Sequence, residues 1–218
     1  MRYKLLSIVA VSSLLLGCAA HLPGRAVYVL VDTSGSYIHE VPKANKIIRY
    51  LIGTLEPGDT IAVGRITSLS FTNHERVAAV TLSLQPATAD AQKRGFATSI
   101  TAFVQAMAHR KGSSYTDISG AFLEAGHFLA SIPAQHKDII VVSDMRQDLP
   151  PHAVRHLTLP LQGIQVFAVN VITSHGENMN PARYMARMHR WDARVTRGGG
   201  HFIVVHELTQ LPALLRTH

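Results

Sequence analysis

The chain has 218 residues, of which 47% are hydrophobic, so it can build a substantial core and is not an intrinsically disordered protein. Its formal net charge is +7, yet it has no block of like charge and no interleaving of aromatic and basic residues, so nothing indicates a nucleic-acid partner. The length suits one domain, and no repeat, low-complexity tract or linker divides it.

The N-terminus has the pattern of an export signal. A short cationic region, MRYK, precedes the apolar LLSIVAVSSLLLG, which is too short for a comfortable membrane span. It ends in LLGC, whose Cys18 is the only cysteine of the chain. Because an exported lone cysteine has no disulfide partner within the chain, lipidation explains it better than a redox role; the alternative is an unmodified thiol.

LLGC resembles the lipobox of bacterial lipoproteins, and this resemblance implies cleavage before Cys18 and acylation of its sulfur. More than one acyl chain gives stable membrane anchoring. Ala19 follows the cysteine in place of an aspartate, which favours the outer membrane, facing the periplasm or the cell exterior. We therefore predict a signal peptide over 1–17, a lipidated tether over 18–24 and one domain over 25–218.

Beyond the tether, strand-like and helix-like segments alternate. We expect strands over 26–32, 60–67, 76–84, 137–144, 165–171 and 201–206. We expect helices over 41–55, 87–109, 117–132, 181–197 and, at the end of the fold, 207–217. Several strands are continuous apolar runs, which is typical of strands covered on both faces.

This alternation predicts an α/β fold: a Rossmann-like, doubly wound, mostly parallel sheet with helices on both faces. The strands over 60–67 and 76–84 are separated only by SLSFTNHE, so we expect them to form a hairpin with one antiparallel edge strand.

Oxygen-bearing side chains follow the predicted strands where functional loops of such sheets lie. Asp32 ends the first strand, and Ser34 and Ser36 follow it in DTSGS. Asp144 ends a later strand, and Thr116 precedes the helix that leads to that strand. Hard ions such as Mg²⁺ prefer an all-oxygen set of this kind, whereas softer ions prefer imidazole or thiolate.

DTSGS matches the D-x-S-x-S signature of von Willebrand factor A domains, and with Thr116 and Asp144 it resembles the metal-ion-dependent adhesion site of that family. The similarity extends over nearly the whole chain after the tether, roughly residues 25 to 216. It implies that Ser34 and Ser36 bind Mg²⁺ or Mn²⁺ directly, that Thr116 does so in the ligand-competent state, and that Asp32 and Asp144 act mostly through water. An acidic group of a partner protein would complete the coordination shell.

The sequence also departs from that family. Met145 and Arg146 follow Asp144, where the family often has glycine, so a cation stands close to the expected metal. Arg146 would either weaken divalent binding or help to receive an anionic ligand. Asp117 and Asp148 lie near the site in sequence and would either substitute as ligands or cap helices.

We expect no enzymatic activity. DTSG also occurs in aspartic proteases, but these need a second equivalent turn, which this chain lacks. Ser34 stands where a haloacid-dehalogenase-type phosphotransferase has its second aspartate. Neither the G-x-S-x-G of serine hydrolases nor a phosphate-binding P-loop is present.

Two further patterns leave alternatives open. His152 and His156 could share one helical face as zinc ligands, although no third ligand is evident and surface histidines are an ordinary explanation. In the helix over 181–197, a predicted buried stripe is accompanied by arginines at the same spacing. These arginines form either a solvated face or a docking ridge for acidic protein, lipid phosphate or cell-wall polymer: Arg183, Arg187, Arg190, Arg194 and Arg197.

Taken together, the sequence predicts a non-enzymatic, membrane-anchored protein-binding module that engages an acidic group of its partner through a divalent metal. The alternative is a metal-independent structural or assembly lipoprotein of the bacterial envelope.

Overall fold

The computed structural model describes residues 24–151, 153 and 157–216. The predicted signal peptide, Cys18, nearly all of the predicted tether, and His152 and His156 lie outside these residues. Within the described part of the chain, no helix is both long and apolar enough to span a membrane.

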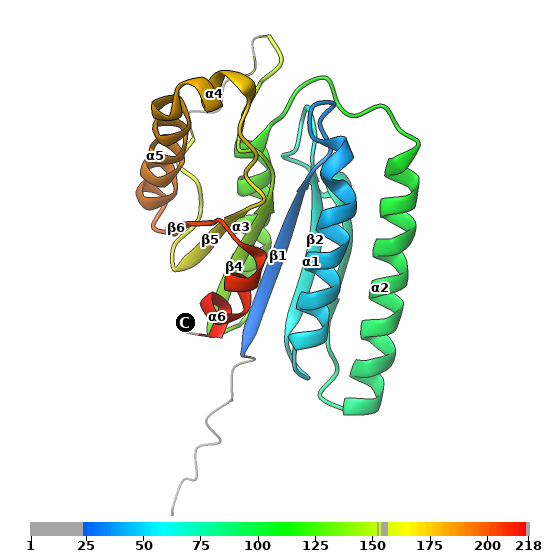
Figure 1. Cartoon of the computed structure of the whole chain (residues 1–218). Helices are drawn as coiled ribbons and strands as arrows, with labels where there is room; N and C mark the ends of the chain where they lie inside the picture. Colours follow the sequence, from blue (N-terminus) through cyan, green and yellow to red (C-terminus); the bar gives the residue numbers. More distant parts are fainter. Residues whose placement is uncertain (1–23, 152, 154–156, 217–218) are drawn as a thin grey trace, which may run out of the picture.

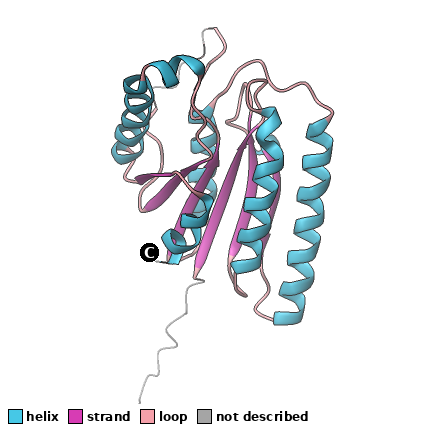
Figure 2. Ribbon diagram, viewed as in Figure 1, coloured by secondary structure: helices cyan, strands magenta, loops and turns pink. Residues whose placement is uncertain are grey.

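One six-stranded sheet forms the centre of the domain (Figure 2). Its strands are β1 (Arg25–Asp32), β2 (Thr60–Ile66), β3 (Arg76–Thr81), β4 (His136–Val142), β5 (Ile164–Val169) and β6 (His201–Val205). The order across the sheet is β3-β2-β1-β4-β5-β6. All neighbours are parallel except β2 and β3, which pair antiparallel at one edge. The predicted fold class, including its edge hairpin, is confirmed.

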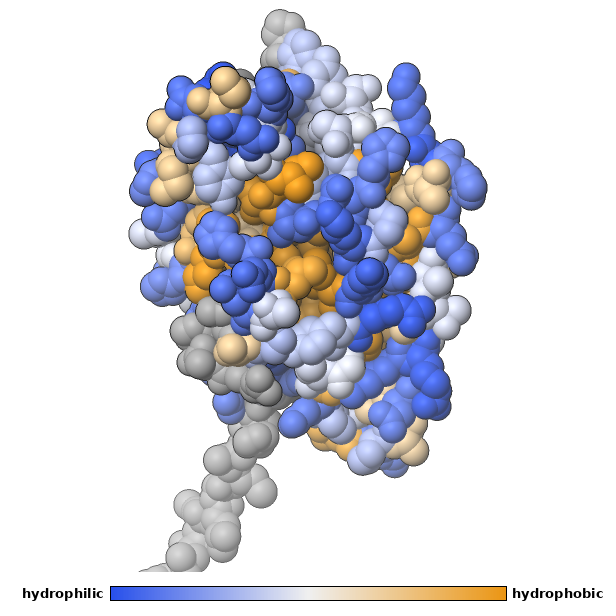
Figure 3. Space-filling model, in the orientation of Figure 1, coloured by the Kyte–Doolittle hydropathy of each residue, from blue (hydrophilic) through white to orange (hydrophobic). Residues whose placement is uncertain are grey.

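Helices cover both faces of this sheet. They are α1 (Val41–Thr54), α2 (Pro86–Ala108), α3 (Ile118–Ser131), α4 (His175–Met179), α5 (Pro181–Arg197) and α6 (Leu211–Arg216). One core cluster joins the sheet to α1, α2 and α6, and a second joins its other face to α3 and α5. In Figure 1, α1 lies in front of the strands and α3 behind them. Hydrophilic residues cover most of the outer face drawn in Figure 3, and apolar ones gather near its middle.

The two clusters explain why β1 is a continuous apolar run. Successive side chains of a strand point to opposite faces, so a strand between two helical layers needs an apolar residue at every position. Alternate residues of β1 enter the two clusters: Val27, Val29 and Val31 enter one, and Ala26, Tyr28 and Leu30 enter the other.

Several boundaries differ from the predicted ones. β4 ends at Val142 and β5 at Val169, two residues earlier than expected. Asn170, which directly follows β5, has a φ of +57°, a conformation that an extended strand does not accommodate. Met145, with a φ of +60°, follows the end of β4 by three residues. β3 ends at Thr81, and the predicted closing helix is a 3₁₀ turn followed by α6. The short helix α4 was not predicted.

The strand order reverses between β1 and β4, which are hydrogen-bonded neighbours. In doubly wound sheets, ligands bind beyond the carboxyl ends of the strands at this switch point. Asp32 is the last residue of β1, and Asp144 follows the end of β4 by two residues. The fold therefore brings the two carboxylates to the same edge.

Candidate metal centre

Asp32 is completely buried at the carboxyl end of β1. Its Oδ1 accepts a hydrogen bond of 2.9 Å from the backbone N–H of Ser34, and its Oδ2 accepts one of 2.6 Å from the hydroxyl of Ser143. Burial raises the pKa of Asp32, the hydrogen bonds from Ser143 and Ser34 oppose this rise, and the nearby Asp144 adds to it. This carboxylate therefore lies where a cation would stabilise its charge.

The two serines of DTSGS lie side by side in the loop that follows. The Oγ atoms of Ser34 and Ser36 are 3.4 Å apart. The carbonyl of Ser34 accepts hydrogen bonds from the N–H groups of Tyr37 (3.0 Å) and Ile38 (2.9 Å), which turn the chain tightly into the 3₁₀ segment Ile38–Glu40. This turn fixes the backbone between the two hydroxyls.

A second loop, between α2 and α3, pairs with the first. Gly35 N–H donates to the Ser113 carbonyl (2.9 Å), and Ser113 N–H donates to the Thr33 carbonyl (3.0 Å). Gly112 packs so closely here that a Cβ atom on it would lie 2.5 Å from the Gly35 nitrogen. Thr116, three residues after Ser113, is thereby brought to the same end of the sheet.

Asp144 lies in the loop after β4 and is buried. Its Oδ1 accepts a hydrogen bond of 2.9 Å from the backbone N–H of Arg146, and its Oδ2 lies 3.2 Å from Nη1 of the same arginine. Burial raises the pKa of Asp144, whereas Arg146 and Arg187 act to lower it. Arg146, which the sequence predicted to lie close to the metal, is thus in direct contact with Asp144, one of the predicted metal ligands.

These loops surround a cavity of about 690 Å³. Its walls include Ser34, Ser36 and Thr116, together with Arg146 and Asp148. Three of the five predicted ligands thus share one cavity. Of the other two, Asp32 lies behind the serines and Asp144 adjoins the cavity through its contact with Arg146.

The donor set fits a hard divalent cation. Ser34, Ser36 and Thr116 offer neutral hydroxyls, and Asp32 and Asp144 offer carboxylates whose burial disfavours their charge when no cation is near. Within the described residues, no group of three or more His, Cys, Asp or Glu side chains is arranged to hold a metal, so the hydroxyls of Ser34, Ser36 and Thr116 are a necessary part of the proposed donor set.

The sequence left open whether Asp117 and Asp148 are metal ligands or helix caps, and the structure gives them different positions. Asp117 is the N-cap of α3: its Oδ1 accepts from the N–H of Gly120 at 2.8 Å, and its Oδ2 accepts from the N–H of Ser70 at 3.3 Å. Asp148 is exposed and lines the cavity, and its backbone exchanges hydrogen bonds of 2.6 and 3.0 Å with Thr116. The capping explanation therefore holds for Asp117.

Sequence reasoning missed two residues beside the site, Ser143 and Glu177. Ser143 donates to Asp32, and Glu177 forms ion pairs with Arg146 and with Arg187. Burial acts to raise the pKa of Glu177, but the Ser174 N–H, Arg146 and Arg187 together lower it to about 2. The S-x-x-E pattern from Ser174 to Glu177 is a capping box that starts α4, and it could have revealed this helix but not its ion pairs.

The predicted stripe of α5 is confirmed for Met188, Trp191 and Val195, which are buried, and Tyr184 is half-buried. Of the two alternatives for the arginines of this helix, the solvated face does not hold for Arg187. Only 5% of Arg187 is exposed, because its guanidinium turns inward to Glu177.

No protein-family model matches the sequence, and no curated protein matches it. Solved structures do resemble the domain. A von Willebrand factor type A protein from Catenulispora acidiphila matches 89% of this chain and 42% of its own, with 16% identity and a TM-score of 0.50. The PilB minor pilin from Streptococcus sanguinis matches 91% of this chain and 61% of its own, with 14% identity and a TM-score of 0.53.

An aerotolerance-related membrane protein from Bacteroides fragilis also matches 89% of this chain and 98% of its own, with 18% identity and a TM-score of 0.49. This chain spans less than two thirds of the Catenulispora and Streptococcus chains. At such low identity the likeness shows the fold alone, which is the α/β fold of a von Willebrand factor type A domain.

Proposed function

We propose that the domain is a non-enzymatic binding module that captures an acidic group of a partner protein through a divalent cation, Mg²⁺ or Mn²⁺. The observation that carries the proposal is that Ser34, Ser36 and Thr116 line one cavity at the switch point of the sheet, with the carboxylates of Asp32 and Asp144 buried beside it. These five residues would hold the ion. When bound, it would supply a positive centre with a coordination position for a partner's carboxylate.

The rest of the cavity wall favours an anionic partner. Arg110, Lys111 and Arg146 line it together with the hydroxyl residues, so its rim is cationic. Cations around a recess attract acidic groups and raise the rate at which they arrive. The von Willebrand factor type A and minor pilin structures with this fold agree with a module of this kind.

Binding is favoured over catalysis by the contacts of the two hydroxyls. Ser34 Oγ and Ser36 Oγ lie beside each other. His39 lines the same cavity, but within the described residues no hydrogen bond links it to either serine. A serine nucleophile needs such a base to remove its proton.

Titration of the full-length chain in a nonionic detergent with MgCl₂ and MnCl₂ tests the proposal. Binding heat and a higher melting temperature are expected, because a ligand that binds the native state stabilises it. The Ser34→Ala/Ser36→Ala variant should lose both effects. Ser99→Ala, which changes an exposed hydroxyl on α2, is the matched control and should retain them.

A metal-independent structural or assembly role is the second candidate, and the contact between Arg146 and Asp144 favours it. A guanidinium at this position already neutralises a carboxylate that a metal site needs. If the wild-type chain gives neither heat nor a melting shift with either ion, the metal-dependent function is abandoned for this one.

We further propose that the protein is anchored in the bacterial envelope by acylation of Cys18, as the lipobox-like LLGC suggests. Cys18→Ser should move the protein from the membrane fraction to the soluble fraction of exporting cells. An unchanged distribution would argue against the anchor without bearing on the metal centre.

A further inference from the structure

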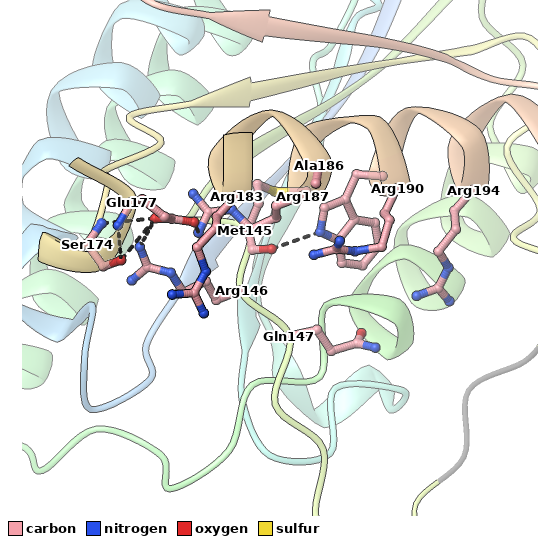
Figure 4. Close-up of a pocket in the computed structure, with 11 residues that line it drawn as sticks. Met145, Arg146, Gln147, Ser174, Glu177, Arg183, Ala186, Arg187, Arg190 and Arg194 are labelled. Atoms are coloured by element: carbon pink, nitrogen blue, oxygen red, sulfur yellow. Dashed lines mark hydrogen bonds and ion pairs between the residues drawn. The ribbon is translucent and has the colours of Figure 1, made fainter. Parts of the chain in front are cut away.

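We propose that the domain has a second binding site, an arginine pocket that takes a phosphoryl oxyanion. This cavity, of about 710 Å³, lies between α5 and the loop after β4. Its charged lining residues are Arg146, Arg183, Arg187, Arg190, Arg194 and Glu177 (Figure 4). The pocket is distinct from the candidate metal centre, and only Arg146 lines both cavities.

The spacing of α5 builds one side of this pocket. Arg183, Arg187, Arg190 and Arg194 are separated by four, three and four residues, which places them on one face of the helix. Like charges at these spacings destabilise a helix, so a shared anionic ligand would relieve their repulsion. Figure 4 shows Arg146 and Gln147 opposite this face, on the loop after β4.

Acidic residues balance only part of this charge. Glu177 pairs with both Arg146 and Arg187, and Asp144 pairs with Arg146. Arg183 and Arg190 are exposed and have no ion pair with any residue that the structure describes. The pocket therefore carries an excess of positive charge that its own carboxylates do not neutralise.

The state of Arg187 points most directly to a missing ligand. Its Nη1 lies 2.7 Å from Oε1 of Glu177, but this contact lacks the alignment of a hydrogen bond. Its Nε and Nη2 are buried and have no hydrogen-bond partner among the described residues. Buried donors of a charged group are costly when unsatisfied. Arg187 lines the cavity, so an oxyanion bound there would supply the acceptor that its guanidinium lacks.

A phosphoryl group fits this arrangement better than a single carboxylate does. Guanidinium groups bind phosphate in a bidentate manner, and a phosphoryl group offers up to two charges and three terminal oxygens to several arginines at once. The cavity volume lies within the range typical of small-ligand sites, so it has room for pyrophosphate or for a phosphomonoester with its organic part.

Aromatic rings hold two of these arginines in place. The guanidinium of Arg187 lies 5.5 Å from the ring centre of Tyr184, and that of Arg194 lies 5.0 Å from the ring centre of Trp191. Trp191 is itself fixed by a hydrogen bond to the Met145 carbonyl. Cation–π contacts of this kind restrain the guanidinium groups before a ligand arrives, which lowers the entropic cost of binding.

Trp191 provides a direct test, because it lines the pocket and is the only tryptophan of the chain. We would titrate the full-length chain in nonionic detergent with pyrophosphate and follow tryptophan fluorescence, with a chelator present to keep divalent ions away. A saturable change is expected. Its absence at millimolar pyrophosphate overturns the proposal, and since no metal is involved, this failure says nothing about the metal centre.

Arg183→Gln/Arg190→Gln removes two exposed arginines of the pocket and should raise the dissociation constant for pyrophosphate at least tenfold. The control, Arg49→Gln/Arg94→Gln, makes the same charge change at exposed positions on α1 and α2 and should change the constant less than twofold. If both variants weaken pyrophosphate binding equally, the effect comes from the overall charge of the protein, and the proposed site is rejected. Arg187→Lys keeps the charge but loses the planar fork, so it should also weaken binding in protein whose circular dichroism is native.

The same change in tryptophan fluorescence distinguishes a soluble phosphate ester from a lipid headgroup as the ligand. Glycerol 3-phosphate represents a soluble phosphomonoester, and micelles doped with phosphatidic acid represent a lipid headgroup, with phosphatidylcholine as the control lipid. A response to the soluble ester supports a small-molecule ligand, and a response to phosphatidic acid alone supports a headgroup. A response to neither contradicts binding of phosphomonoesters.

Discussion

The indole Nε1 of Trp191 donates a hydrogen bond of 2.8 Å to the backbone carbonyl of Met145. Met145 is completely buried and has a φ of +60°, a backbone conformation that residues other than glycine rarely adopt. Asp144 and Arg146 flank it. This single bond therefore ties α5 to the loop that serves both proposed sites.

Trp191→Phe should lower the free energy of unfolding by about 1–3 kcal/mol, because it leaves the buried carbonyl of Met145 without its donor. The aromatic contact with Phe122, at a centroid distance of 5.5 Å, can be kept by the smaller ring. Urea denaturation followed by circular dichroism measures the change. We also expect weaker Mg²⁺ binding, since Asp144 sits on the loosened loop. Unchanged stability would mean that the bond does not hold this loop.

Gly112→Ala should reduce Mg²⁺ affinity at least tenfold in calorimetry. A Cβ atom at this position would lie 2.5 Å from the nitrogen of Gly35 and 2.6 Å from its Cα, so the loops carrying Ser34 and Thr116 must move apart. The matched control is Gly95→Ala in α2, where nothing lies within 4 Å of the added atom. That change should leave metal binding intact and stabilise the helix by about 0.5–1 kcal/mol.

Arg146→Gln should raise Mg²⁺ affinity several-fold and weaken pyrophosphate binding. The guanidinium lies 3.2 Å from Asp144 Oδ2, where it would compete with a bound metal for the carboxylate, and Arg146 also lines the arginine pocket. In the wild type the two ligands should therefore influence each other's affinity by the same factor. Changes of the same sign for both ligands in the variant would contradict competition at Asp144.

The ion pair between the buried Asp138 and the half-buried Arg25 predicts a dependence of stability on pH. Asp138 Oδ2 lies 3.3 Å from Arg25 Nε, and burial raises the pKa of Asp138 to about 6 although the guanidinium acts to lower it. Between about pH 4 and pH 6 the folded state keeps this proton while the unfolded state has lost it. This contribution to stability is thus complete below the unfolded pKa and disappears as pH rises through 6.

Asp138→Asn should remove this dependence. The difference in unfolding free energy between wild type and variant should change by roughly 3 kcal/mol from pH 4 to pH 6.5, with the wild type losing stability. Denaturant titrations at intervals across this range would measure it. Parallel curves for the two proteins would show that Asp138 titrates normally.

Much of the fold was predictable because its signals are local. The apolar run of β1 reflects its place between two helical layers, and the apolar stripe of α5 reflects packing on one face of the sheet. The loop after Asp32 was predictable for the same reason, since its residues are adjacent in sequence. The positive φ of Met145 in the loop after β4 was not predictable, because methionine rarely adopts this conformation and nothing in the sequence marks it.

Long-range ion pairs escaped prediction for a different reason. Arg187 looked like a surface residue because periodicity reports which face of α5 it lies on, not what covers that face. The covering group, Glu177, comes from α4 and belongs to a helix too short to give a periodic signal. The arginine pocket therefore became visible only from the packing of these elements.

The course of β1 through the sheet also has a consequence for orientation. The strand begins at Arg25 at the lower end of the sheet in Figure 1 and carries Asp32 to the opposite end, about 25 Å away for a strand of eight residues. If Cys18 is acylated as proposed, the end of the sheet at Arg25 lies nearest the bilayer, and the candidate metal centre at the other end faces away from it. Proteins in the surrounding compartment would then reach the candidate metal centre more easily than lipids of the membrane that holds the anchor.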